Sequence, residues 1–233
     1  MQPTYLPWAG YFNLISKVDY FVFLDDAQFQ KGSWHNRNRL LINQAAAWIT
    51  VPVMRAFLGQ PICDAKIDDS KAWRKQHVQT IRQNYSHHPF FASLEQIISI
   101  IEDSNIKILS DLNIRLITEI CNVINLKYHF IRSSELQVEG RRSDKIKNIC
   151  EKLNCAEYLS PLGAKEYLEE DQFTQLSDIK LSINSYDSVP YAQRKSAQFE
   201  SYLSIVDVLA NLGPKKTYDY IIGIKNQEVA NVS

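Results

Sequence analysis

Residues 128–170 have the sequence YHFIRSSELQVEGRRSDKIKNICEKLNCAEYLSPLGAKEYLEE, and this stretch decides the fold class. Short runs rich in aromatic and β-branched residues alternate here with segments whose apolar residues recur at helical spacing. The pattern predicts a strand at 128–131, a helix at 143–153, a strand at 156–159, a turn at 160–163 and a helix at 164–170. Strand, helix and strand in this order are typical of a parallel sheet with helices on its faces. We therefore expect an α/β protein with a Rossmann-like three-layer αβα domain.

The rest of the chain extends this pattern. Ser143 is the predicted N-cap of its helix, because its hydroxyl can accept a hydrogen bond from a free N–H of the first turn. Gly213-Pro214 is a helix-ending signal. Further helices are predicted at 9–17, 72–85, 90–102, 111–126 and 202–212, and further strands at 20–24, 38–42, 48–53 and 180–183. Residues 43–46 are the predicted turn of a hairpin between two of these strands. Since no linker-like or repetitive segment interrupts the sequence, we expect one domain over residues 1–233, with the β-hairpin as an extension.

The composition is that of an ordinary globular protein. Of the 233 residues, 45% are hydrophobic and 22% are charged, and the formal net charge is zero. A protein that grips nucleic acid usually carries a basic surplus, so nucleic acid is not an expected partner. The four cysteines form no CxxC pair, which favours reduced thiols and argues against a zinc site. No apolar run is long enough to span a membrane, and the N-terminus does not resemble a signal peptide, so we expect no membrane insertion and a cytoplasmic protein.

The first candidate site is the loop at residues 1–12, MQPTYLPWAGYF, which opens a predicted helix. Free N–H groups at a helix N-terminus favour an anion, and Gln2 and Tyr5 add neutral hydrogen-bonding groups. The alternative is an aromatic turn that serves only packing.

The second candidate site follows the predicted strand at 20–24. Asp25 and Asp26 come directly after that strand, and ligands of open α/β sheets bind beyond the carboxyl ends of the strands. The loop and strand that follow are rich in hydrogen-bond donors and contain an indole surface, at Gln28, Lys31, Trp34, His35, Asn36, Arg37, Asn38 and Arg39. This mixture suits a sugar, a nucleotide or a phosphate. The alternative is a solvated loop in which the arginines pair with carboxylates.

Two weaker candidates complete the set. His77 lies on the apolar stripe of the predicted helix at 72–85, where a core histidine is the commoner outcome, although histidine suits general-base catalysis near neutral pH. Ser160 and Gly163 stand between a strand and a helix, an arrangement that can cradle an anion, with Tyr167 one helical turn further on. A purely structural turn is the alternative there.

Taken together, these motifs resemble the WbqC-like family. The resemblance rests on QPTYLPWAGYF at 2–12, DYFVFLDDAQFQKGSWHNRNR at 19–39, WITVPV at 48–53, WRKQHVQTIRQNY at 73–85 and YLSPLGAKEYL at 158–168. It extends through SYLSIVDVLANLG at 201–213 and so covers nearly the whole chain. The family is associated with bacterial gene clusters for O-antigen and other surface polysaccharides, and glycine transfer to a sugar has been suggested for it.

The resemblance implies a transferase that joins an activated amino acid, such as glycine, to a nucleotide-linked or lipid-linked amino sugar. In that hypothesis His77 or Asp25 is the base that takes a proton from the attacking amine. The other assigned residues bind the substrate, as hydrogen-bond donors, stacking surfaces or the opposite wall: Gln2, Tyr5, Gln28, Trp34, Asn36, Arg37, Arg39, Ser160, Gly163 and Tyr167. No metal ligands are assigned, and the cofactor is left open. Two alternatives remain, namely a nucleotidyl-transfer or adenylating enzyme and a non-catalytic sugar-binding partner in polysaccharide assembly.

Two departures from the family pattern affect these expectations. Members usually carry a short apolar strand before the QP motif, whereas this sequence begins at Met1. The resemblance therefore implies a truncated chain, a start at an internal methionine, or a sheet that lacks an edge or central strand. Pro161 stands where a glycine is commoner, and it is expected to stiffen the turn after Ser160.

Overall fold

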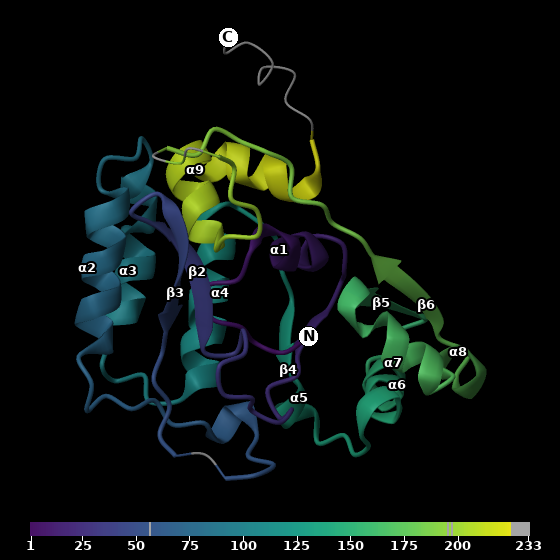
Figure 1. The fold of residues 1–233 in the computed structure, drawn as a ribbon. Coiled ribbons are helices and arrows are strands. Elements are labelled where there is room, and N and C mark those ends of the chain that lie inside the picture. The colour runs from purple at the N-terminus through teal and green to yellow at the C-terminus, as the bar shows by residue number, and fades with distance from the viewer. Residues whose placement is uncertain (56, 195, 197, 225–233) are drawn as a thin grey trace.

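A computed structural model describes residues 1–55, 57–194, 196 and 198–224 of the protein, which combines helices with short strands (Figure 1). The six strands pair into three two-stranded sheets within this part of the chain. The parallel pairs are β1 (Phe21–Phe23) with β4 (Phe130–Arg132) and β5 (Glu157–Pro161) with β6 (Lys180–Asn184), and the antiparallel pair is β2 (Arg37–Ile42) with β3 (Ala45–Thr50).

The expected α/β class agrees with this mixture, but a single Rossmann-like sheet does not form among the described residues. The strands at 130–132 and 157–161, which were expected to share a parallel sheet, belong to different pairs. The two parallel ladders contain three and five residue pairs, so each provides few backbone hydrogen bonds. Contacts between segments that are distant in the sequence therefore decide which strands pair.

The predicted hairpin is confirmed, with a tighter turn than expected. Asn43 and Gln44 both have positive φ, at 50° and 68°, as the central residues of a type I′ turn require. Asparagine tolerates this conformation better than most residues do. The second strand therefore starts at Ala45, three residues before the predicted start at Trp48.

A large core is built from buried residues between Tyr5 and Leu126 and between Leu203 and Ile221, and the second group lies mostly on the last helix. Its helices are α1 (Ala9–Ile15), α2 (Trp73–Tyr85), α3 (Glu95–Glu102), α4 (Leu109–Val123) and α9 (Ile205–Ile222), with 3₁₀ turns at Ile62–Asp64 and Phe91–Leu94. The predicted stripe on α2 is confirmed, since Trp73, His77, Ile81 and Tyr85 are all buried. No helix in the described ranges is long and apolar enough to cross a membrane.

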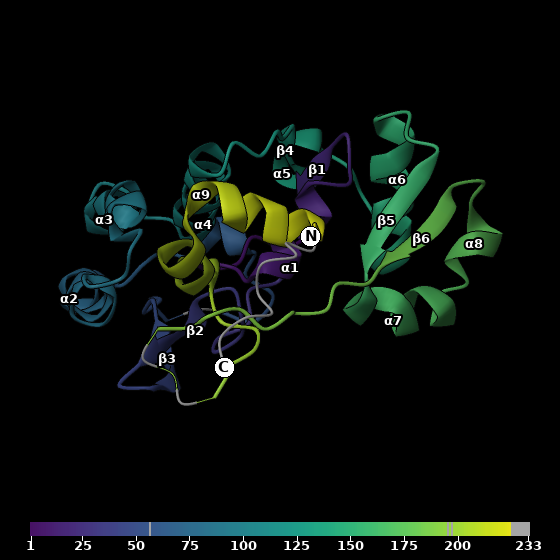
Figure 2. The same cartoon turned by 90° about the horizontal axis from the view of Figure 1, so that it is seen from above.

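A smaller core lies beside β5 and β6 (Figure 2). It is covered by α6 (Arg142–Lys152), α7 (Lys165–Glu170) and α8 (Phe173–Leu176); α5 (Ser133–Leu136) links β4 to this part, and a 3₁₀ turn spans Leu162–Ala164. The prediction that Ser143 caps α6 is wrong. The helix begins at Arg142, so Ser143 lies within its first turn and not at the N-cap, and its hydroxyl donates to Asp171 at 2.7 Å.

The helix-ending signal at Gly213-Pro214 marks a kink instead of an end. Gly213 has φ 75° and ψ 171°, which interrupts α9, but Pro214 then starts a second helical segment that runs to Ile222. Proline is well tolerated at the first position of a helix, because its missing N–H would have no partner there. A Cβ at Gly213 would lie 2.5 Å from the Phe90 ring, so both backbone and space require glycine.

Candidate functional site

The first loop of the chain is held against the start of the hairpin by a buried asparagine. The side-chain amide of Asn38, on β2, donates to the carbonyls of Tyr5 at 3.0 Å and Leu6 at 2.7 Å. Leu6 has φ 43°, a conformation that non-glycine residues rarely adopt and that needs support from its surroundings. The Tyr5 N–H donates to the carbonyl of Trp34 at 3.1 Å. Two motifs that the sequence placed in separate candidate sites therefore lie side by side.

Two further asparagines fix the same region. Asn113 of α4 donates to the carbonyls of Pro3 at 3.1 Å and His35 at 2.8 Å. Asn36 donates to the carbonyl of Val51 at 2.8 Å and accepts from the N–H of Gly32. Asn36 is 3% exposed, so its side chain supports the loop and does not face solvent.

His77 and Tyr5, two predicted site residues, form a hydrogen-bonded pair inside the core. The Tyr5 hydroxyl lies 2.9 Å from Nδ1 of His77, and both side chains are buried. Burial lowers the pKa of His77 to about 4, against a smaller opposing effect of a backbone hydrogen bond at Thr50. Burial also raises the pKa of the Tyr5 hydroxyl, so both groups are neutral at pH 7. Their geometry fits a packing role.

The accessible part of the predicted site is an aromatic–arginine surface, formed by Trp34, Arg37, Arg39 and Trp48. The two indoles are each 45% exposed and their ring centroids lie 5.0 Å apart. Arg37 and Arg39 share one face of β2, and Trp48 lies opposite Arg39 in the hairpin register. The guanidinium of Arg37 stacks 4.1 Å from the centroid of the Trp48 ring, and that of Arg39 lies at 6.0 Å.

The two arginines of this surface carry uncompensated charge. Neither forms an ion pair with any residue that the structure describes. The Nε atoms of both are shielded from solvent without a hydrogen-bond partner in the same part of the chain. Arg39 donates only to the carbonyls of Ser201 and Tyr202, at 3.2 and 3.4 Å. A stacked, unpaired guanidinium beside exposed indoles suits an anionic ligand with a ring.

Trp48 was missed because its position depends on the hairpin register.

A second polar cluster lies at the carboxyl ends of β1 and β4, where α/β proteins bind ligands. Asp25 is fully buried and accepts from the Ser134 N–H at 3.0 Å and hydroxyl at 2.7 Å. Ser133 bridges the two carboxylates, donating to Asp26 at 2.5 Å and lying 3.3 Å from Asp25. Lys145 pairs with Asp26, and both of these side chains remain about one-fifth exposed. The cluster joins the two strand ends and α6, and leaves one carboxylate within reach of solvent.

The remaining predicted residues do not join the aromatic–arginine surface. Ser160 is buried on β5 and Tyr167 belongs to α7, in the part of the molecule across from the hairpin (Figure 2). Nothing lies within 4 Å of a Cβ built on Gly163, so close packing does not require that glycine. Gln2 and Gln28 are exposed.

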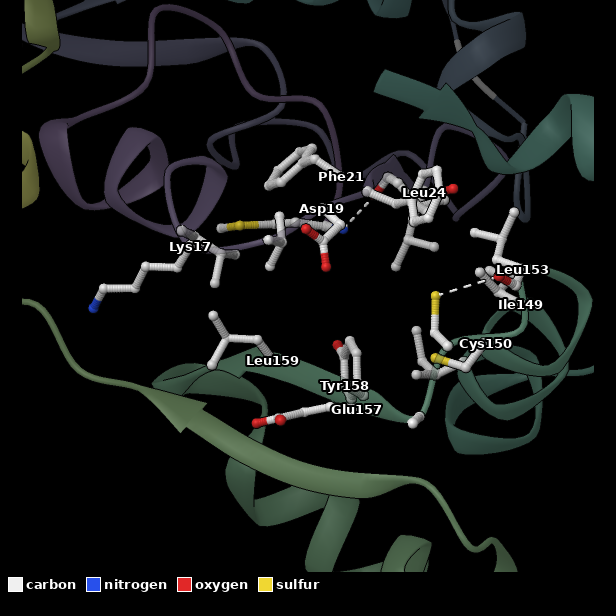
Figure 3. Close-up of a pocket in the computed structure, with 18 of the residues that line it drawn as sticks. Lys17, Asp19, Phe21, Leu24, Ile149, Cys150, Leu153, Glu157, Tyr158 and Leu159 are labelled. Carbon is white, nitrogen blue, oxygen red and sulfur yellow. Dashed lines mark hydrogen bonds between the residues drawn. The ribbon is translucent and has the colours of Figure 1, made fainter. Parts of the chain in front are cut away.

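A cavity of about 540 Å³ separates β1 from β5, and none of the predicted site residues lines it (Figure 3). Most of its lining residues are apolar, but backbone groups and the side chains of Lys17, Asp19 and Glu157 make much of its surface polar. No local pattern in the sequence indicates this cavity, because it arises between two strand pairs that remain apart. Within the described residues, no group of three or more His, Cys, Asp or Glu side chains is placed to hold a metal ion.

Comparisons with known proteins place the chain in a family. The model of the WbqC-like protein family matches residues 2–219. A protein described as "Uncharacterized protein Rv1507c", from Mycobacterium tuberculosis (strain ATCC 25618 / H37Rv), is 34% identical over 224 residues, which cover 95% of each chain. No solved structure matches. On the extent of the family match, which includes every motif that suggested it, this chain belongs to the WbqC-like protein family.

Proposed function

We propose that the chain binds a phosphate-bearing sugar, such as a nucleotide-linked amino sugar, on its aromatic–arginine surface. The observation that carries this proposal is the guanidinium of Arg37, which stacks on Trp48 beside Trp34 and forms no ion pair with the described residues. A guanidinium binds phosphate oxygens in a bidentate manner, and an indole face packs against a sugar or base ring. The proposed context is bacterial surface polysaccharide biosynthesis, in keeping with the family resemblance.

Binding can be tested with uridine diphosphate N-acetylglucosamine as the probe. Trp34 and Trp48 provide a fluorescence signal, and calorimetry gives the dissociation constant. We expect Arg37→Ala to weaken binding roughly 10-fold or more, since a hydrogen bond to a charged group contributes about 1.5–3 kcal/mol. Arg115→Ala is the matched control, because Arg115 is an exposed arginine on α4 that pairs with Asp103 at 2.8 Å. Equal affinity in the Arg37 and Arg115 variants would refute the proposal.

A second proposal adds aminoacyl transfer at the polar cluster around Asp25 and Asp26, at the carboxyl ends of β1 and β4. The partly exposed Asp26–Lys145 pair favours this proposal. In this reaction the amine nitrogen of the sugar attacks the acyl carbonyl carbon. A carboxylate takes the proton that the nitrogen loses, and the bond from the acyl carbon to its leaving group breaks with the electron pair on the leaving group. Because His77 and Asp25 are both buried, the partly exposed Asp26 is the better candidate for the base.

Mass spectrometry of the surface polysaccharide tests the transfer reaction. Deletion of the gene is expected to remove an aminoacyl substituent from an otherwise intact repeat unit, and Asp26→Asn is expected to reproduce the loss. If the repeat unit stays unchanged while the purified protein still binds the nucleotide sugar, the transfer reaction is excluded. The non-catalytic sugar-binding role then remains.

A further inference from the structure

Two cysteines, Cys150 and Cys155, lie at the two ends of the turn that closes α6. The Cys155 N–H donates to the Cys150 carbonyl at 2.8 Å, and the Asn154 N–H donates to the Glu151 carbonyl at 3.1 Å. Asn154 has φ 52°, in the left-handed region. These two hydrogen bonds and this φ define a Schellman motif, in which the side chains at the positions of Cys150 and Cys155 commonly pack against each other.

The surroundings of the two side chains agree with such a contact. Cys150 is 6% exposed and belongs to the smaller core, and Cys155 is partly buried and packs against that core. Burial, followed by repulsion from a thiolate at Cys155, raises the pKa of the Cys150 thiol to about 11. Because repulsion between charges weakens with distance, the two sulfur atoms are close together.

The turn also gives the pair the backbone separation of a disulfide. A disulfide joins residues whose Cα atoms are roughly 4.4–6.8 Å apart. Residues joined directly by backbone hydrogen bonds fall within this range, as in the hydrogen-bonded pairs of an antiparallel sheet at about 5.5 Å. In a flexible segment the two ends must first be brought together at a cost in chain entropy. In the folded turn they are already together.

We propose that Cys150 and Cys155 form a dithiol site that a small disulfide, such as oxidised glutathione, converts reversibly to an intramolecular disulfide. Both cysteines are free thiols in this structure, which is the reduced state of the pair. The reaction is a thiol–disulfide exchange in two steps.

The first step takes place at Cys155, which is more exposed than Cys150. Its thiol loses a proton to solvent and attacks one sulfur of oxidised glutathione, and one glutathione leaves as a thiolate. The Cys150 thiol then loses its proton and attacks the Cys155 sulfur, which releases the second glutathione thiolate. Two protein thiols are oxidised, one disulfide is reduced to two thiols, and the two released protons go to the two glutathione thiolates.

Peptide mapping tests whether this disulfide forms. The folded protein is incubated with oxidised glutathione at pH 8.5, because the raised pKa values of both thiols leave few thiolates at pH 7. Trypsin cleaves after Lys152, so the disulfide leaves peptides 148–152 and 153–165 joined. We expect the joined peptides to appear in mass spectrometry and to separate on treatment with dithiothreitol. Two separate peptides, either free or each carrying glutathione, would overturn the proposal.

Two variants locate the chemistry. In Cys150→Ser the mixed disulfide of Cys155 with glutathione has no thiol to resolve it, so it is expected to accumulate. The matched control is Cys63→Ser, in the 3₁₀ turn at Ile62–Asp64, in which the joined peptides should form as in the wild type. Loss of the joined peptides in a folded Cys63→Ser protein would show that the disulfide arises by exchange through Cys63, and would overturn the proposed reaction.

A redox titration measures the contribution of the turn. The fraction of joined peptides is followed against the ratio of oxidised to reduced glutathione, in the folded protein and in the same protein unfolded in concentrated urea. Closing the six-residue segment from Cys150 to Cys155 costs entropy in the unfolded chain, so we expect the equilibrium constant for oxidation to be at least roughly 10-fold larger in the folded protein. Equal constants would show that the turn does not build the site, and would overturn the proposal.

Discussion

Replacement of His77 by glutamine should reduce by one the number of protons that this protein takes up when it unfolds in acid. His77 is 5% exposed and bonded to Tyr5, and burial lowers its pKa to about 4 from the ordinary 6.5. The unfolded chain therefore binds a proton below pH 6.5 that the folded chain does not bind until pH 4. Stability contributed by the neutral ring is present above pH 6.5 and is lost as the pH falls to 4. At about 1.4 kcal/mol per pKa unit, the loss is about 3 kcal/mol.

The assay is urea denaturation at a series of pH values between 4 and 7. Buried His35, with a pKa of about 4 for the same reason, and the buried Met1 ammonium, with a pKa of about 5, also bind protons mainly in the unfolded chain, so the wild-type slope exceeds the contribution of His77 alone. His77→Gln is expected to reduce the slope by about 1.4 kcal/mol per pH unit. Equal slopes for the wild type and the His77 variant would show that His77 titrates freely, which would restore it as a candidate base.

Three other predictions follow from the packing. Asn38→Ala leaves two carbonyls of the first loop without their donor and should destabilise the protein by about 2–3 kcal/mol, measured by thermal denaturation. Gly10→Ala would place a Cβ 2.3 Å from the Trp8 ring and should cost about 1–3 kcal/mol, whereas Gly163→Ala meets nothing within 4 Å and should be neutral in the same assay. Burial and nearby carboxylates raise the pKa of the Cys63 thiol to about 11, so iodoacetamide should alkylate it roughly 100-fold more slowly than a free cysteine at pH 7.5. A reaction as fast as that of free cysteine would contradict this account of Cys63.

Local patterns in the sequence predicted the elements of the fold better than their assembly. The stripe on α2 and the hairpin turn at Asn43 depend on residues close together in the chain, and both are confirmed. The pairing of β1 with β4 joins segments about 100 residues apart, and periodicity does not reveal such a partner. Ser143 is not the cap because the helix begins one residue before it, at Arg142, and the side chain bonds to Asp171, 28 residues away.

In the candidate site, too, the residues close together in the sequence were predicted better than the contacts between distant segments. Trp34, Arg37 and Arg39 were predicted from one short segment, and they do share a surface. Ser160 was grouped with them on the assumption of one continuous sheet, and it lies in the smaller unit instead. Trp48 could have been added from the sequence, because a two-residue turn at Asn43-Gln44 places it opposite Arg39.

The two asparagines that hold the first loop also constrain when that loop forms. Asn38 is 33 residues from Tyr5 and Asn113 is 110 residues from Pro3, so the loop acquires its anchors only after the hairpin and α4 have come together. Contacts between such distant segments form late, because closing a long loop costs entropy before the contact returns any stability. The loop that precedes both of its anchors in the sequence is thus among the last segments to reach its final conformation.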